Sequence, residues 1–229
     1  RTELLIGSEN VKRLEKASVL VFGVGGVGSY CVEALARAGI GRFALFDGDV
    51  VSKSNINRQL IALHSTVGKF KCEVARQRIL DINPDAKVEV FNEFYTLGNA
   101  DCIDFSGFDY VADAIDMISS KLLIVEKAKK AGVPVICAMG AGNRLDPTGF
   151  TVTDIYNTKD CPLARVMRRE LRKKNITDLK VVFSSESPYK EFNKTADLQT
   201  PVIASVSFVP SAEGLIMASE IIKDIITLP

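Results

Sequence analysis

A glycine-rich segment near the start of the chain has the composition of a nucleotide-binding loop. Residues 23–28 read Gly-Val-Gly-Gly-Val-Gly, directly after a short apolar run and directly before a predicted helix. Glycines at such a turn let the backbone approach a phosphate, whose charge then meets the helix amino terminus. The candidate residues are Gly23, Gly25, Gly26 and Gly28. Taken alone, the loop fits a dinucleotide cofactor as well as ATP, or glycines needed only for helix–strand packing.

Polar side chains that follow the second apolar run favour ATP. Asp47 lies about 20 residues after the loop, where a carboxylate can hold a ribose hydroxyl. An oxidoreductase has little need of further charges there. An adenylating enzyme does, because charge builds up on the departing pyrophosphate, and Arg58 and Lys71 can neutralise it. The candidate ATP-binding set is therefore Asp47, Asp49, Asn55, Arg58, Gln59 and Lys71.

A second acidic segment predicts a metal ligand. Asp113-Ala114-Ile115-Asp116 follows another apolar run, and ligands of open α/β sheets bind at the carboxyl ends of the strands. A carboxylate opposite nucleotide phosphates is suited to Mg²⁺, so Asp116 is the candidate metal ligand. The alternative is that Asp116 caps the helix that follows.

The order of the predicted elements indicates how these residues are positioned. Strands alternate with helices in the pattern of a Rossmann-like, doubly wound α/β fold, with a mainly parallel sheet and helices on both faces. We expect one domain over 1–229: a nucleotide-binding core at 1–142 and a substrate-binding extension at 143–229, with further strands and helices and a mobile loop at about 184–200. Strands are predicted at 18–22, 42–46, 87–91, 109–112, 133–137, 150–155 and 180–183, and helices at 26–38, 67–83, 122–131, 162–174 and 211–226.

Composition excludes several classes of protein. The 229 residues are 47% hydrophobic and carry a formal charge of +1, which excludes a disordered chain and a highly basic nucleic-acid module. The five cysteines are scattered without a Cys-x-x-Cys pair, so we expect neither a disulfide framework nor a structural zinc. With no apolar run long enough to cross a bilayer, we expect a cytoplasmic protein without a membrane partner.

These motifs together resemble the ubiquitin-activating-enzyme-like (ThiF/MoeB/HesA) superfamily over residues 1 to about 160. The resemblance assigns the glycine loop and the polar set to ATP, Asp116 to Mg²⁺, and catalysis to Arg58, Lys71 and Asp116. Arg1 resembles a catalytic arginine that family members donate into the ATP site of a partner subunit. The resemblance therefore implies a homodimer.

Within the superfamily the chain is most similar to the tRNA threonylcarbamoyladenosine dehydratase (TcdA/YgdL-like) branch. The matching phrases are residues 27–29, 33–41, 82–84, 113–116, 140–143, 146–148 and 183–186. The branch implies ATP-dependent cyclisation of N6-threonylcarbamoyladenosine at position 37 of tRNA, through adenylation of its carboxylate, with a glycine segment, Gly140–Gly142, shaping the acyl pocket. A cysteine-desulfurase or sulfur-acceptor system is a further implied partner. The alternative is adenylation of the carboxyl-terminal glycine of a ubiquitin-like sulfur carrier, whose enzymes commonly hold a zinc with paired cysteines.

One segment is strongly basic. Between residues 162 and 180, seven Lys or Arg stand against two Asp or Glu, a local charge of +5. A helix with this charge suits tRNA phosphates, although a solvated helix face gives the same pattern. The candidate tRNA-binding residues are Arg165, Arg168, Arg169, Arg172, Lys173 and Lys174.

Three further hypotheses follow from single features. Cys161, at the start of the basic helix, has the position of a nucleophilic thiol, although ring closure does not require one. A non-catalytic scaffold that binds nucleotide has no chemical reason to keep the complete set of charged residues. An NAD oxidoreductase is supported by the glycine loop alone.

Overall fold

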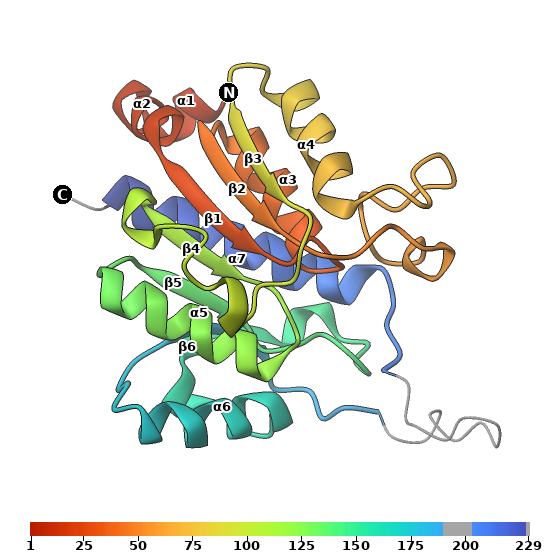
Figure 1. Cartoon of the computed structure of the whole chain (residues 1–229), viewed down its shortest axis with the longest axis vertical. Coiled ribbons are helices and arrows are strands. Elements are labelled where there is room, and N and C mark those ends of the chain that lie inside the picture. Colours follow the sequence, from red (N-terminus) through yellow and green to blue (C-terminus); the bar gives the residue numbers. More distant parts are fainter. Residues whose placement is uncertain (190–202, 228–229) are drawn as a thin grey trace.

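A single seven-stranded sheet forms the centre of the molecule (Figure 1). The structure, a computed structural model, describes residues 1–189 and 203–227. The strand order is β3-β2-β1-β4-β5-β7-β6, and every neighbouring pair is parallel except β6 and β7. The strands are β1 (Ser18–Phe22), β2 (Arg42–Phe46), β3 (Lys87–Phe91), β4 (Tyr110–Asp113), β5 (Val135–Ala138), β6 (Phe150–Asp154) and β7 (Lys180–Ser184).

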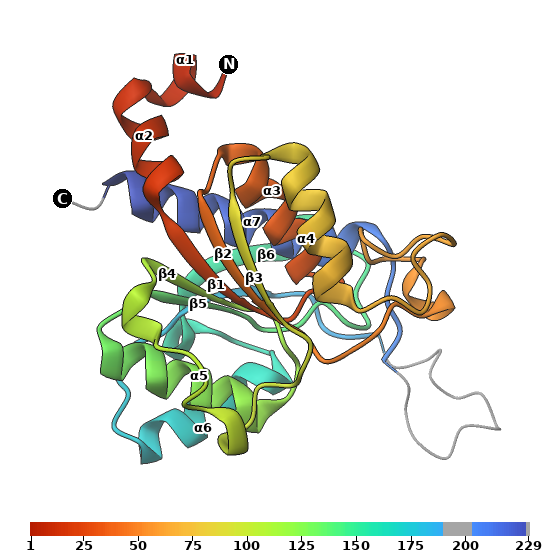
Figure 2. The same cartoon turned by 45° about the horizontal axis from the view of Figure 1, so that its top comes forward.

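Helices cover both faces of this sheet, so the predicted α/β fold class is confirmed (Figures 1 and 2). α3, α4 and α7 pack on one face and α5 and α6 on the other. Side chains alternate along β1 accordingly: Val19 and Val21 join the first core, while Leu20 and Phe22 join the second. The described helices are α1 (Thr2–Ile6), α2 (Ser8–Lys16), α3 (Gly28–Ala38), α4 (Lys71–Ile82), α5 (Ile118–Ala131), α6 (Pro162–Lys173) and α7 (Phe208–Thr227), with 3₁₀ turns at Lys53–Asn55, Leu97–Asn99, Phe105–Gly107, Pro147–Gly149 and Ile155–Asn157.

All seven strands were predicted, but four helix starts were wrong: the helices predicted from residues 26, 67, 122 and 211 begin at Gly28, Lys71, Ile118 and Phe208. The helix predicted at 67–83 begins only at Lys71, because the preceding residues pair with the loop after β2. There Gly68 N–H donates to the Val51 carbonyl, and Val51 N–H donates to the Lys69 carbonyl. The helix predicted at 26–38 begins at Gly28, so the glycine loop itself is not helical. Most of the loop predicted at 184–200 lies outside the described residues.

The first two helices had no sequence prediction. α1 has no buried residue, and Leu4 and Leu5 are 90% and 87% exposed. α2 is fixed to the body by Leu14, which is fully buried and whose carbonyl accepts a hydrogen bond from Gly41 N–H. Figure 2 shows α1 projecting from the rest of the molecule. None of the described helices is long and apolar enough to cross a membrane.

The order of the strands creates a crevice at one end of the sheet. From β1 the chain proceeds outward to β2 and β3, then returns to β4 on the other side of β1. The loops after β1 and β4 therefore diverge, and such a switch point is where open α/β sheets bind ligands. The two loops still touch at their base, where Gly23 lies against the Ala114 carbonyl.

A close approach between α3 and α7 supports the glycine loop from beneath. A Cβ atom added to Gly214 in α7 would overlap the Val27 carbonyl oxygen, at the residue before α3. Pro210, one turn earlier in α7, lies against Gly26. The last described helix thus fixes the position of a loop near the start of the chain.

Replacing Gly214 by Ala tests this support. The added methyl group must push α7 away from α3, so we expect the free energy of unfolding to fall by about 1–3 kcal/mol, measured by urea denaturation. Gly107→Ala is the matched control, because nothing lies within 4 Å of a Cβ added there, and we expect a change below about 0.5 kcal/mol. Equal stabilities of the two variants would contradict the proposed contact.

Candidate active site

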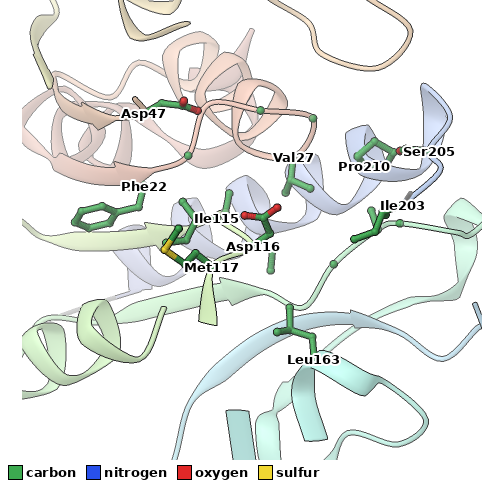
Figure 3. Close-up of a pocket in the computed structure, with 18 of the residues that line it drawn as sticks. Phe22, Val27, Asp47, Ile115, Asp116, Met117, Leu163, Ile203, Ser205 and Pro210 are labelled. Atoms are coloured by element: carbon green, nitrogen blue, oxygen red, sulfur yellow. The ribbon is translucent and has the colours of Figure 1, made fainter. Parts of the chain in front are cut away.

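A cavity of about 740 Å³ opens at the carboxyl ends of the strands. In Figure 3, Asp116 is at its centre, with Phe22 and Met117 toward one end and Leu163 and Ile203 toward the other. Ten of the predicted residues line this one cavity, although they come from four separate segments of the chain. They are Gly23, Gly25, Gly26, Asp47, Asp49, Asn55, Arg58, Gln59, Lys71 and Asp116.

Gly28, the remaining loop residue, is buried behind the cavity wall and does not line it. A Cβ atom there would overlap the Gly23 carbonyl oxygen, so the turn from β1 into α3 closes only around glycine. Its role is to shape the loop. The sequence pattern did not distinguish this role from contact with a ligand.

Asp47 holds the glycine loop against the end of β2. One carboxylate oxygen accepts a hydrogen bond from Val24 N–H at 2.8 Å, and the other accepts one from Asp49 N–H at 2.9 Å. Burial raises the pKa of Asp47, and the charge of Lys71, 3.8 Å away, opposes that rise. The position of Asp47 in the cavity wall is that expected of a ribose ligand, and that assignment stays a prediction.

Two cations of this wall differ in their surroundings. Lys71 is buried at the first residue of α4 and forms an ion pair of 2.6 Å with Asp49. Arg58 is half-buried, packs against Gly26, and donates to the Ser54 carbonyl and the Asn57 amide oxygen. Within residues 1–189 and 203–227, no carboxylate forms an ion pair with Arg58. Its charge is therefore available to an anion in the cavity.

The two amides of the set have different partners. Asn55 caps its own 3₁₀ turn, because its side-chain oxygen accepts a hydrogen bond from Ser52 N–H. Gln59 is buried beside Gly25, and its side-chain oxygen has no hydrogen-bond partner among the described residues. Asn55 thus shapes the loop, whereas Gln59 keeps an acceptor free.

Asp116 does not cap a helix, so the alternative interpretation of this residue is wrong. α5 begins two residues later, at Ile118, with Met117 in the capping position. Asp116 is exposed to the cavity, and no hydrogen bond to its carboxylate occurs in the described part of the chain. There, no three His, Cys, Asp or Glu side chains converge as a complete metal site. A single carboxylate nevertheless suits Mg²⁺, which commonly takes one or two carboxylates together with substrate phosphates.

A buried charged cluster that the sequence did not reveal lies beneath the cavity. Lys121 of α5 and Asp113 at the end of β4 are fully buried and 2.9 Å apart. Lys121 also donates to the Ile115 carbonyl at 3.0 Å, and Asp113 accepts from Ile115 N–H at 3.3 Å. Burial is the largest effect and lowers the pKa of Lys121, but Asp113, Cys137 and Glu213 together outweigh it and leave the pKa raised. In the sequence, Lys121 looks like an ordinary surface residue of a helix.

Glu213 of α7 is the second buried carboxyl group of this region. It accepts a hydrogen bond from Met139 N–H at 3.1 Å, at the start of the loop after β5. Burial raises the pKa of Glu213 to about 7, although the charges of Lys121 and Arg144 act in the opposite direction. The ends of two neighbouring strands, β4 and β5, are thus attached to buried ionisable groups.

The end of the cavity near Leu163 and Ile203 is largely apolar. Gly140, Ala141 and Gly142 form one side, as the sequence predicted for an acyl pocket, and Ile203 packs directly on Gly142. Asn143 fixes the neighbouring segments: it exchanges two hydrogen bonds of 2.8 Å with Ala204, and its carbonyl accepts from Tyr189 N–H at 2.8 Å.

Cys161 lies in this wall as the cap of α6. Its buried thiol donates to the Met139 carbonyl and accepts from Ala164 N–H, both at 3.4 Å. These two contacts favour a structural role for the thiol.

The opposite end of the cavity contains residues that sequence analysis missed. Phe94 and Tyr95, in the loop after β3, line it together with Met117 and Phe22. Phe94 is 55% exposed and packs against Gly48. No motif marks these residues, because a flat apolar surface places no demand on spacing in the sequence.

The basic helix α6 reaches the cavity only at its start, through Pro162 and Leu163. Several of its charges already have partners. Arg168 donates hydrogen bonds to Thr158 and to the Ile155 carbonyl, and the guanidinium of Arg172 lies 5.2 Å from the centre of the Tyr156 ring. Arg169 and Lys173 form ion pairs with Glu170. Lys174 forms one with Glu126. Arg165 is exposed, and no ion pair involving it occurs among the described residues. A tRNA-binding role for this helix stays a prediction.

Arg1 does not line the cavity of its own chain. It precedes α1, which lies at the far end of the sheet from the cavity (Figures 1 and 2). A role for Arg1 at an ATP site therefore requires a second subunit, as the resemblance implies, and stays a prediction.

Comparison with known proteins identifies similar sequences and structures. A model of the ThiF family matches residues 1–228. A tRNA threonylcarbamoyladenosine dehydratase of Bacillus subtilis is 43% identical over 237 residues, covering 99% of this chain and 93% of that protein. A crystal structure of the Escherichia coli tRNA N6-threonylcarbamoyladenosine dehydratase in complex with AMP has a TM-score of 0.88 at 33% identity, covering 98% of this chain and 92% of the other. The same protein in complex with ATP has a TM-score of 0.89.

A more distant similarity leads to sulfur-transfer proteins. An adenylyltransferase and sulfurtransferase of Saccharomyces cerevisiae, UBA4, is 38% identical over 149 residues. That match covers 65% of this chain and 33% of the yeast protein. The similarity to the dehydratases therefore extends over more of both chains.

Replacing Lys121 by Met tests the buried cluster. Met fills a similar volume but leaves Asp113 as an uncompensated buried charge, so we expect the free energy of unfolding to fall by roughly 3–5 kcal/mol in urea denaturation. The double variant Asp113→Asn/Lys121→Met removes both charges and should recover most of that loss. If the single variant is as stable as the wild type, the ion pair does not stabilise the floor of the cavity.

Proposed function

The chain belongs to the ThiF family, and from that premise we propose that it is an ATP-dependent enzyme that dehydrates N6-threonylcarbamoyladenosine at position 37 of tRNA. Two findings support the proposal. The Bacillus subtilis dehydratase matches nearly the whole chain, and the similar Escherichia coli enzyme has been crystallised with ATP and with AMP. Cyclisation of the threonylcarbamoyl group with loss of water is the reaction.

The observation that carries the proposal is that phosphate-binding cations and an acyl-sized apolar wall share one cavity. The substrate carboxylate is ionised at neutral pH and needs no general base. It attacks the α-phosphorus of ATP, and pyrophosphate leaves. Arg58 and Lys71 neutralise the charge that builds up on the phosphates, while Asp47 holds the ribose and the free oxygen of Gln59 accepts a hydrogen bond from the bound ligand.

Adenine occupies the end of the cavity formed by Phe22, Phe94 and Met117, because an apolar surface suits a flat base. Asp116 would hold a Mg²⁺ ion together with phosphate oxygens. When bound, that ion supplies positive charge to the departing pyrophosphate. Ring closure then needs only a nucleophile within the substrate itself, so Cys161 has no covalent role.

The rival function is adenylation of a ubiquitin-like sulfur carrier. Its support is the match to UBA4, which covers 33% of that protein, against 93% for the Bacillus subtilis dehydratase. The more complete match favours the dehydratase.

Several partners belong to the same proposal. tRNA contacts the protein beside the cavity, with Arg165 in α6 as an exposed cation for which no ion pair occurs among the described residues. The enzyme acts as a homodimer in which Arg1 enters the ATP site of the other subunit, and a cysteine-desulfurase or sulfur-acceptor system is a further partner. A cytoplasmic location follows from a tRNA substrate. The chain is one domain, with residues 143–229 extending the nucleotide-binding core.

Replacing Lys71 by Ala tests the phosphate assignment. Without the ammonium group the transition state loses a preorganised charge, and we expect ATP–pyrophosphate exchange to fall at least about 100-fold. The exposed neighbour Lys69, which does not line the cavity, provides the matched control, and Lys69→Ala should exchange at the wild-type rate. Unchanged exchange in Lys71→Ala would refute the assignment, and circular dichroism checks that the variant is folded.

A direct substrate test separates the two candidate functions. The protein is incubated with ATP and Mg²⁺ together with either threonylcarbamoyl-modified tRNA or a ubiquitin-like sulfur carrier, and AMP formation is measured. We expect AMP with the modified tRNA and not with unmodified tRNA, accompanied by a product lighter by one water in mass spectrometry. AMP formation only with the sulfur carrier would overturn the proposal in favour of its rival.

A further inference from the structure

One cation of the cavity wall, Arg144, has no role in the proposed binding of ATP. Arg144 follows the loop after β5 and is only 3% exposed, yet it lines the cavity beside Gly140 and Gly142. It therefore belongs to the acyl end of the cavity. The phosphate-binding cations, Arg58 and Lys71, come from the loop after β2 and the start of α4.

The guanidinium group of Arg144 is held by two neutral oxygens. Nη1 donates to the Gly140 carbonyl, and Nε donates to the Glu186 carbonyl at 3.2 Å. Among the described residues no carboxylate lies within the 4.0 Å of an ion pair. A guanidinium has five N–H donors, so two of them account for only part of its capacity.

Glu213 is a weak source of compensating charge for Arg144. Burial raises the pKa of Glu213 to about 7, and the two cations that oppose this rise, Lys121 and Arg144, share the same carboxyl group. Asp113 already pairs with Lys121. Burying a charge is costly unless it is paired and hydrogen-bonded. An anion in the cavity would complete the partners of Arg144.

We propose that Arg144 binds the carboxylate of the acyl substrate and keeps one of its oxygens through both chemical steps. The inference rests on the proposed function, since it assumes a carboxylate substrate. A planar guanidinium matches a planar carboxylate. Leu163 and Ile203, which line the same end of the cavity, are apolar, so among the described residues Arg144 supplies the positive charge there.

The same contact serves adenylation and ring closure. In adenylation one carboxylate oxygen forms a bond to the α-phosphorus, pyrophosphate leaves, and the other oxygen stays on Arg144. In ring closure a nitrogen of the substrate bonds to the acyl carbon, and negative charge grows on the retained oxygen, where the guanidinium stabilises it. The bond to AMP then breaks, AMP leaves with the electron pair, and the proton of the nitrogen passes to solvent.

The surroundings of Arg144 fix its position before substrate binds. The Glu186 carboxylate accepts hydrogen bonds from Leu145 N–H and Asp146 N–H, at 3.1 and 2.9 Å, while its carbonyl holds Arg144. The turn that carries the arginine is therefore attached to the end of β7. A cation oriented in this way needs little rearrangement when the anion arrives.

The test compares two anticodon stem–loop RNAs, one with the threonylcarbamoyl acid and one with its neutral carboxamide. Dissociation constants are measured in the presence of a non-hydrolysable ATP analogue. We expect the wild type to prefer the acid by about 10- to 100-fold, the range for hydrogen bonds to a charged group. Arg144→Met should lose that preference by binding the acid more weakly, with affinity for the carboxamide and for ATP unchanged.

Two controls separate charge recognition from structural support. Arg144→Gln keeps a donor for the Gly140 carbonyl without the charge, and should lose the preference as Arg144→Met does. Arg42 also donates to a backbone carbonyl, that of Gly107, but begins β2 at the opposite end of the sheet, so Arg42→Gln should retain the preference.

The outcomes are distinguishable. The assignment of Arg144 is overturned if its variants keep the preference for the acid. It is also overturned if they lose affinity for both RNAs equally, as loss of a phosphate contact would cause. In both cases the proposed function stands as long as the wild type forms AMP with the acid. A wild type that binds neither RNA and forms no AMP overturns the proposed function itself.

Discussion

The buried ion pair between Asp113 and Lys121 is the interaction on which the geometry of the site depends. Asp113 ends β4, and Lys121 reaches it from α5, so the pair joins a strand end to a helix on one face of the sheet. Both partners also hold the backbone of Ile115, directly before the candidate metal ligand Asp116. Either charge would be costly to bury without the other, so the two side chains must stay in contact. This contact makes the floor of the cavity rigid.

Charge is distributed unevenly around that floor. Cations line the walls: Lys71 and Arg58 on the side of β2, and Arg144 on the side of β5. The buried carboxyl groups of Asp113 and Glu213 do not line the cavity. Asp47, Asp49, Glu93 and Asp116 also line the cavity, so its walls carry both signs of charge, and a triphosphate or a carboxylate would be bound at the individual cations.

The sequence predicted the fold class and all seven strands. β1 and β2 are short apolar runs that end at Gly23 and Asp47, as is typical of buried parallel strands, whereas β3 was predicted from its alternating pattern. Helix starts were predicted less accurately. The helix from Lys71 lost its predicted first turn because Gly68 and Lys69 pair with Val51, a contact between segments that periodicity within one segment does not contain. α1 buries none of its five residues, which leaves no buried face to detect. α2 is amphipathic over nine residues, with Leu14 as its buried residue, and was missed.

The sequence by itself determined which residue types the candidate nucleotide site contains, because glycines before a helix and charged side chains after strands are set by local spacing. The tertiary structure decided which residues meet. Gly28 shapes the loop and does not line the cavity, and Asp116 does not cap a helix. Arg144, Glu213 and Lys121 interact although they come from three distant segments of the chain. Burial converts an ordinary lysine, glutamate or arginine into a functional group, and burial is a property of the packed molecule.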